Sequence, residues 1–161
     1  MSISVGAKIP DATLMRMTDK GPQPITTAEL FNGKKVVVFA VPGAFTPTCS
    51  NQHLPGFVQQ AEALKKKGVD TIACVSVNDA FVMGAWGNDQ KVGDKVMMLA
   101  DGNGDFTKTL GLGLDASGFG MGQRSARYAM IVDNGVVKYL GKEHNPGAVA
   151  ETGAEKILSL L

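Results

Sequence analysis

Lys35-Val-Val-Val-Phe-Ala-Val41 is a lysine followed by an unbroken run of apolar, mostly β-branched residues. Such a run predicts a strand buried on both faces, as in a sheet that is covered by helices on either side. The next residues, Pro42-Gly-Ala-Phe-Thr-Pro-Thr48, end that strand, because proline cannot donate to a ladder and glycine favours a turn. We therefore expect the fold to be organised around this strand and the turn after it.

Cys49 follows that turn and is expected in the first turn of a helix. Thr46 or Thr48 could cap this helix, and Pro47 is tolerated near a helix start. The N–H groups and macrodipole at a helix N-terminus favour a thiolate, which is the nucleophilic form of cysteine. An unperturbed thiol with a pKa of about 8.5 is only about 3% ionised at pH 7, so full ionisation raises reactivity by at most about thirtyfold. A fast enzyme also needs groups that hold the reacting atoms of its substrate.

The rest of the chain alternates between predicted strands and helices. Strands are expected over residues 12–17, 69–77, 96–100, 126–132 and 136–140, and helical segments over 27–31, 56–67, 78–86, 106–110 and 154–161. Asp133-Asn-Gly135 predicts a hairpin, and Gly21–Pro24 predicts a turn. Asn78 is expected to cap one helix, and Pro55 to kink another. The pattern predicts an α/β fold with a mixed central sheet flanked by helices, in one domain over residues 1–161.

Charge and cysteine content narrow the function classes. The chain has 16 Lys and Arg against 15 Asp and Glu, a balance that gives no electrostatic argument for a nucleic-acid or membrane partner. Two cysteines among 161 residues do not make a disulfide scaffold and are typical of a reducing compartment. The N-terminal residues show no signal-peptide pattern, so we expect a cytoplasmic protein.

Three blocks of sequence resemble the peroxiredoxins, which are thiol peroxidases on a thioredoxin-like fold. Pro42-x-x-x-Thr46-x-x-Cys49 is similar to their active-site motif. The longer string V-P-G-A-F-T-P-T-C-S-x-x-H-L-P-G-F, with C-V-S-V-N-D-A-F-V-M-x-x-W from Cys74 and R-S-A-R-Y-A-M from Arg124, resembles the peroxiredoxin 5 or type II subfamily. The resemblance covers nearly the whole chain.

The resemblance implies roles for four residues. Cys49 matches the peroxidatic nucleophile, and Thr46 matches the threonine whose hydroxyl binds the hydroperoxide. Pro42 would shape and shield the pocket. Arg127, which precedes a strongly apolar run, matches the arginine that stabilises the thiolate and orients the peroxide. From the residues alone, Arg127 has a second interpretation as a structural salt bridge, because a buried cation requires a partner.

Three further residues are expected close to this site. Arg124 lies three residues before Arg127, a spacing that does not place both on one strand face, so we assign it to a loop or to the surroundings of the site. Thr48 is assigned there too, with its backbone N–H directed at the peroxide. His53 shares a helical face with Cys49 if the helix is regular, and we favour packing or hydrogen bonding over a general-base role. No metal or other cofactor is expected.

The expected reaction is reduction of hydrogen peroxide or an alkyl hydroperoxide to leave a sulfenic acid on Cys49. Cys74 resembles a second cysteine of plant type II members and is a candidate resolving residue, but its apolar surroundings favour a buried structural cysteine. If Cys74 is structural, glutaredoxin with glutathione, or thioredoxin, would reduce Cys49 directly. The resemblance also suggests a homodimer. Two alternatives are a thioredoxin-like thiol–disulfide oxidoreductase, which usually needs Cys-x-x-Cys, and a non-catalytic binding or chaperone module.

Overall fold

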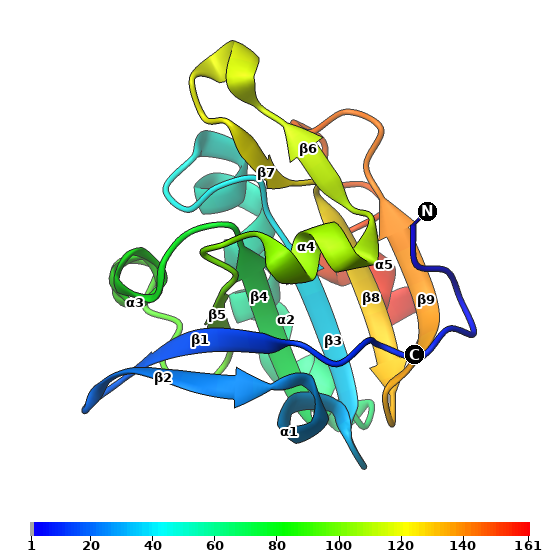
Figure 1. The fold of residues 1–161 in the computed structure, drawn as a ribbon. Coiled ribbons are helices and arrows are strands. Elements are labelled where there is room, and N and C mark those ends of the chain that lie inside the picture. Colours follow the sequence, from blue (N-terminus) through cyan, green and yellow to red (C-terminus); the bar gives the residue numbers. More distant parts are fainter. Residues whose placement is uncertain (1) are drawn as a thin grey trace.

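The run that begins at Lys35 forms strand β3 (Lys35–Ala40) inside a seven-stranded sheet, as seen in the computed structural model, which describes residues 2–161 (Figure 1). Val36 through Ala40 have no exposed surface, which confirms a strand buried on both faces. Its alternate side chains enter two different cores, because successive residues of a strand point to opposite faces.

The sheet is mixed and has the strand order β2-β1-β5-β4-β3-β8-β9. Strands β3, β4 and β5 are parallel, whereas β1, β2, β8 and β9 pair in antiparallel fashion. The strands are β1 (Thr13–Thr18), β2 (Gly21–Thr26), β4 (Thr71–Ser76), β5 (Met97–Ala100), β8 (Tyr128–Asp133) and β9 (Val136–Lys142). A second, two-stranded sheet is the hairpin of β6 (Gly113–Asp115) and β7 (Gln123–Ser125), which encloses the short 3₁₀ turn η2 (Ser117–Phe119).

Helices cover both faces of the large sheet. On one face pack α2 (Leu54–Lys66), α3 (Ala80–Asp89) and α5 (Ala154–Ser159); on the other pack α1 (Thr27–Phe31) and α4 (Asp105–Leu110). In Figure 1, α4 crosses in front of the strands while α2 and α5 lie behind them. This arrangement confirms the predicted α/β class with a mixed sheet flanked by helices. Among residues 2–161, no helix is long and apolar enough to cross a membrane.

The predicted turn at Gly21–Pro24 is wrong, because these residues belong to strand β2. Pro22 pairs with Met17 and Pro24 with Met15, at the edge of the sheet. An edge strand directs alternate N–H groups away from its neighbour, so two prolines spaced two residues apart remove no ladder bond. The predicted hairpin at Asp133–Gly135 is confirmed, and Asn134 and Gly135 both have positive φ, as a tight hairpin turn requires.

Candidate active site around Cys49

The turn after β3 is held by hydrogen bonds to Gly43. The Thr46 hydroxyl and the Thr46 N–H both donate to the Gly43 carbonyl, at 2.7 and 3.4 Å. A Cβ atom at Gly43 would lie 2.9 Å from the terminal methyl of Met121 and 3.2 Å from the Thr46 side chain, so only glycine fits without a shift. The loop that carries Thr46 is therefore closely packed against its surroundings.

A second contact fixes this loop and corrects one prediction. The side-chain oxygen of Asn78 accepts a hydrogen bond from the Ala44 N–H at 3.0 Å and another from the Ser76 hydroxyl. Asn78 is therefore not the cap of α3; Asp79 caps it, with its carboxylate accepting from the Val82 N–H at 2.8 Å. Because β3 and β4 are parallel neighbours, the residues after each strand meet at the same sheet edge.

Cys49 lies in the first helical turn, as expected. Helical residues begin at Pro47, and the first intrahelical bond runs from the Ser50 N–H to the Thr46 carbonyl at 2.9 Å. The N–H groups of Thr48 and Cys49 come before this bond and have no earlier carbonyl of the helix to donate to. The side chains of Thr46 and Thr48 do not cap the helix, since the Thr46 hydroxyl is committed to Gly43. The Thr48 hydroxyl lies 3.5 Å from the Gly147 carbonyl.

Pro55 is accommodated by a π-turn. Residues Cys49–His53 form the π-helical segment η1, which is followed directly by α2, and the Leu54 N–H donates to the Cys49 carbonyl. Since Pro55 has no N–H, a regular α-helical bond is lost at this point, and the wider turn occurs immediately before it. Cys49 and His53 still face the same neighbour, because both contact Arg127.

The Arg127 guanidinium contacts the Cys49 sulfur. Its Nη2–H donates to Cys49 Sγ at 3.0 Å, and both side chains are buried. The pairing of β3 with β8 explains the contact, because Ala40 lies opposite Tyr128 and the chain leaves β3 just where Arg127 enters β8. Arg127 Nε–H donates to the Pro146 carbonyl at 2.9 Å. Within residues 2–161 the sole ion pair is Lys156–Glu151, so the alternative of an Arg127–carboxylate salt bridge does not occur.

His53 completes the surroundings of the guanidinium. Arg127 Nη1–H donates to His53 Nδ1 at 2.8 Å; since a guanidinium can only donate, Nδ1 is the unprotonated nitrogen. His53 Nε2–H then donates to the Thr152 carbonyl at 2.8 Å. Burial, with the Arg127 charge as a smaller cause, lowers the pKa of His53 to about 3, so the imidazole is neutral at physiological pH. Its lone pair is occupied by Arg127 and cannot accept the Cys49 proton.

The remaining predicted residues lie around this centre without a hydrogen bond to Cys49. Arg124 donates to the carbonyls of Val77 (3.2 Å) and Met121 (2.9 Å) behind the Gly43 turn. Pro42 is half-buried at the start of the turn. Cys74 is fully buried in β4 and borders the same core as Cys49, and burial raises the pKa of its thiol well above the usual range.

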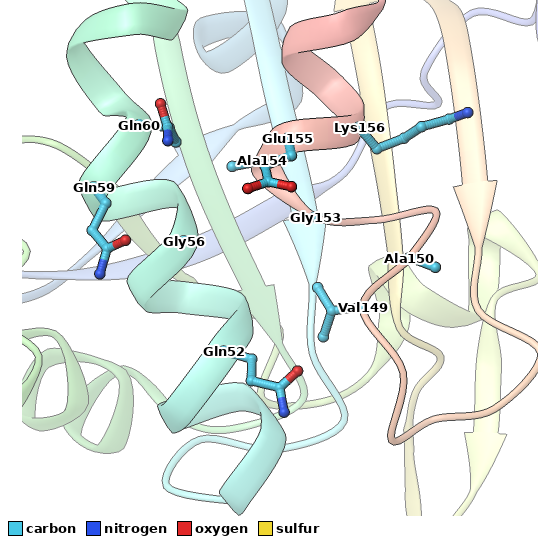
Figure 2. A pocket seen from close by; sticks show the side chains of 10 residues that line it. All are labelled: Gln52, Gly56, Gln59, Gln60, Val149, Ala150, Gly153, Ala154, Glu155 and Lys156. Carbon is cyan, nitrogen blue, oxygen red and sulfur yellow. The ribbon is translucent and has the colours of Figure 1, made fainter.

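A cavity of about 540 Å³ lies beside the site, between helix α2 and the segment 149–156 (Figure 2). It is lined by Gln52, Gly56, Gln59, Gln60, Val149, Ala150, Gly153, Ala154, Glu155 and Lys156. Gln52 is the residue before His53, but Cys49 itself does not line the cavity and has no exposed surface.

Sequence reasoning missed three contributors to this geometry. Asn78 was predicted only as a helix cap. Thr152, which accepts from His53, and Glu143, whose carboxylate accepts from the Thr152 N–H at 2.8 Å, were not predicted at all, because their contacts leave no local sequence pattern. The Thr152 contact with His53 spans 99 residues. A buried glutamate in a loop, Glu143, has no local pattern that marks it.

Comparison with known families and structures places the chain clearly. Residues 4–158 match the Redoxin family. The chain is 52% identical to peroxiredoxin-2E, chloroplastic, of Arabidopsis thaliana over 99% of its own length and 70% of that protein. It is 50% identical to peroxiredoxin-2C of Oryza sativa subsp. japonica, over 99% of its own length and 98% of the relative.

The chain is also similar over nearly its whole length to solved structures of peroxiredoxins. Reduced Prx3 of Vibrio vulnificus in complex with H₂O₂ is 56% identical and has a TM-score of 0.93, with 98% of each chain covered. Peroxiredoxin 5 of Alvinella pompejana is 36% identical and has a TM-score of 0.84, covering 98% of this chain and 96% of that one.

Proposed function

This chain belongs to the Redoxin family and is a peroxiredoxin, a thiol peroxidase, and on that premise we propose that the Cys49 thiolate is the group that attacks the peroxide. The thiolate sulfur attacks the nearer peroxide oxygen and the O–O bond breaks. Cys49 retains that oxygen as a sulfenic acid, and the leaving hydroxide or alkoxide takes a proton to become water or alcohol. The family assignment decides against a disulfide oxidoreductase or a non-catalytic module.

One observation carries the assignment to Cys49: a buried guanidinium donates to Sγ at 3.0 Å and has no carboxylate within ion-pair distance among the described residues. Its other two contacts are neutral, a carbonyl and an uncharged imidazole. A buried cation in such surroundings favours an anion on its remaining neighbour, which is the sulfur. Arg127 therefore favours the thiolate of Cys49.

The peroxide oxygens need hydrogen-bond donors of their own. The Arg127 guanidinium and the first-turn N–H groups of Thr48 and Cys49 are donors on the segments that meet at the sulfur. The Thr46 O–H already donates to the Gly43 carbonyl, so its oxygen is left to accept a hydrogen bond from a peroxide O–H. Donors placed where charge develops lower a barrier more than ionisation alone. We assign them to binding the two oxygens and to stabilising charge as the O–O bond breaks; Pro42 shapes the turn.

Recycling of the sulfenic acid is assigned to an external thiol, from glutaredoxin with glutathione or from thioredoxin. The thiol attacks the Cys49 sulfur, water leaves, and a mixed disulfide forms that a second thiol reduces. Burial of Cys74 within a strand, with a thiol pKa raised by that burial, supports a structural role. A cytoplasmic location is part of the proposal, because two free cysteines without a disulfide are typical of a reducing compartment.

The decisive experiment measures hydrogen peroxide turnover by the wild type, Cys49→Ser and Cys74→Ser, with the glutaredoxin and thioredoxin systems supplied separately. Cys49→Ser should show no turnover with either system, and Cys74→Ser should keep it. Turnover by Cys49→Ser would exclude Cys49 as the nucleophile. Loss of turnover in a folded Cys74→Ser variant would instead make Cys74 the resolving cysteine.

A homodimer is the proposed assembly. Phe45, Phe81 and Phe119 are 52%, 67% and 87% exposed, which is unusual for aromatic side chains of this size. Phe45 lies 6.4 Å from the buried Trp86, measured between ring centroids, so the active-site turn packs against α3, the helix that also carries Phe81. Sedimentation of the wild type and Phe81→Asp tests the proposal: the variant should shift toward a monomer, and a monomeric wild type would contradict it.

A further inference from the structure

Glu143 is a buried carboxylate that the proposed chemistry does not use. It follows β9, is only 7% exposed, and its Oε2 accepts hydrogen bonds from the N–H groups of Glu151 and Thr152, at 2.7 and 2.8 Å. Its own N–H donates to the Arg127 carbonyl at 3.0 Å. A buried carboxylate is stabilised by such N–H donors. The two bonds connect Glu143 to residues that lie eight and nine positions later in the chain.

These bonds close the loop 144–150 into a ring. The ring and its closing residues supply two carbonyl acceptors to the active site. Pro146 accepts from Arg127 Nε–H at 2.9 Å, and Thr152 accepts from His53 Nε2–H at 2.8 Å. The contacts link the Glu143 carboxylate to the N–H of Thr152, and the carbonyl of the same residue to His53, Arg127 and finally the Cys49 sulfur.

A cavity separates part of this segment from the helix. In Figure 2 the stretch from Val149 to Gly153 runs beside α2, with the cavity of about 540 Å³ between them. Val149, Ala150 and Gly153 line that space, and Ala150 is exposed, whereas Thr152 between them is buried. The Thr152 backbone is therefore held by hydrogen bonds in addition to its burial, and the Glu143 carboxylate accepts two of them on the buried side.

We propose that Glu143 is a positioning residue for the peroxidase reaction: its carboxylate closes the loop 144–150 and thereby fixes the Arg127–His53 pair against the Cys49 sulfur. The proposal rests on the proposed function of Arg127. It assigns to Glu143 no contact with the peroxide. What matters is the acceptor oxygen at the end of the side chain, not its negative charge.

The test compares Glu143→Ala and Glu143→Gln, with Glu155→Ala as the matched control on the exposed start of α5. The rate of Cys49 oxidation by hydrogen peroxide should fall about 10²-fold in Glu143→Ala, since a misplacement of about 1 Å can cost that much. Glu143→Gln should stay within about threefold of wild type, because one amide oxygen can accept both N–H groups. Glu155→Ala should match the wild type.

A second readout separates positioning from a general loss of structure. Absorbance of the thiolate at 240 nm, followed against pH in a Cys74→Ala background, should show Cys49 ionising at higher pH in Glu143→Ala and normally in Glu143→Gln. If Glu143→Ala does not fold, Glu143→Asp replaces it, since it keeps the charge but withdraws the oxygen by one methylene; it should lose rate while Gln does not.

The proposal is overturned if Cys49 of Glu143→Ala, or of Glu143→Asp in its place, is oxidised at the wild-type rate. It is also overturned if Glu143→Gln lowers that rate as much as Glu143→Ala does. Arg127→Ala, measured in parallel, keeps the two proposals apart. If Arg127→Ala itself retains the wild-type rate, the proposed function of Arg127 fails. If only the Glu143 variants retain it, the positioning role alone fails.

Discussion

Replacing Arg127 by alanine divides the proposed chemistry into two measurable parts. The guanidinium lies 3.0 Å from Cys49 Sγ, where two unit charges at an effective dielectric of about 20 attract by about 5 kcal/mol before desolvation is counted. A hydrogen bond to a charged group contributes about 1.5–3 kcal/mol net, which corresponds to about 10–10²-fold in an equilibrium between the charged and neutral forms. Losing it lowers the thiolate population at pH 7 by at most about thirtyfold.

The second part is the loss of a donor to the breaking O–O bond, which is worth about 10²–10³ in rate. Multiplying the loss of thiolate by the loss of this donor predicts that Arg127→Ala lowers the rate of peroxide reduction about 10³–10⁴-fold at pH 7. Near pH 10 the thiol ionises without help, so the first factor disappears and a loss of about 10²–10³ should remain. Arg127→Lys keeps a charge but cannot reach all three partners, and should fall between wild type and Ala at pH 7.

The assay is stopped-flow oxidation by hydrogen peroxide, with the fluorescence of Trp86 as its signal. Trp86 is the chain's single tryptophan, and its Nε1–H donates to the Ser50 hydroxyl, next to Cys49, at 3.0 Å. Arg16→Ala is the matched control, because this arginine lies in β1, on another part of the sheet. If the loss in Arg127→Ala vanishes completely at pH 10, Arg127 acts through ionisation alone and its role in binding peroxide is refuted.

The remaining predictions concern His53, Thr46 and Cys74. The His53 pKa is lowered to about 3 in the folded protein, so between about pH 3 and 6.5 the unfolded chain binds a proton that the folded one does not, and stability falls with acid in that window. Urea unfolding should show about 3 kcal/mol less stability from this residue at pH 4 than at pH 7, and His53→Gln should lack that component; equal pH profiles would contradict the assignment. Thr46→Val removes the hydroxyl that donates to Gly43 and should slow peroxide reduction by about 10–10²-fold, whereas Thr46→Ser should keep the wild-type rate. An unchanged rate in Thr46→Val would show that the Thr46 hydroxyl does not take part in the reaction. Because burial raises the pKa of Cys74, its thiol should stay protonated at pH 7, and iodoacetamide should modify Cys49, beside Arg127, while sparing Cys74 in the native protein, as peptide mapping can show; labelling of Cys74 before Cys49 would contradict the raised pKa.

Local pattern predicted much of the fold. The apolar run before Pro42 marks β3, the Asp133–Gly135 turn marks the β8–β9 hairpin, and the α5 side chains Ala154 and Ile157 are buried as their spacing indicates. Each of these features depends on residues that are close together in the sequence. The edge strand β2 was mistaken for a turn because proline normally ends strands, and only its place at the sheet edge makes Pro22 and Pro24 acceptable.

The candidate site was predictable only where a motif names a residue. Cys49, Thr46 and Arg127 were assigned from the motif blocks, and the pairing of β3 with β8 brings Cys49 and Arg127 into contact. Hydrogen bonds to backbone carbonyls, such as that from His53 to Thr152, leave no trace in sequence because any residue can supply the carbonyl. Pro55 was predicted to kink the helix, and its missing N–H is instead accommodated by the π-turn at Cys49–His53.

The most direct test of the account treats the reduced protein with one equivalent of hydrogen peroxide in the presence of dimedone and maps the modified peptide by mass spectrometry. We expect one dimedone adduct, on Cys49, and its loss in Cys49→Ser. An adduct on Cys74, or no adduct while peroxide is still consumed, would contradict the claim that the sulfur beside Arg127 carries the reaction.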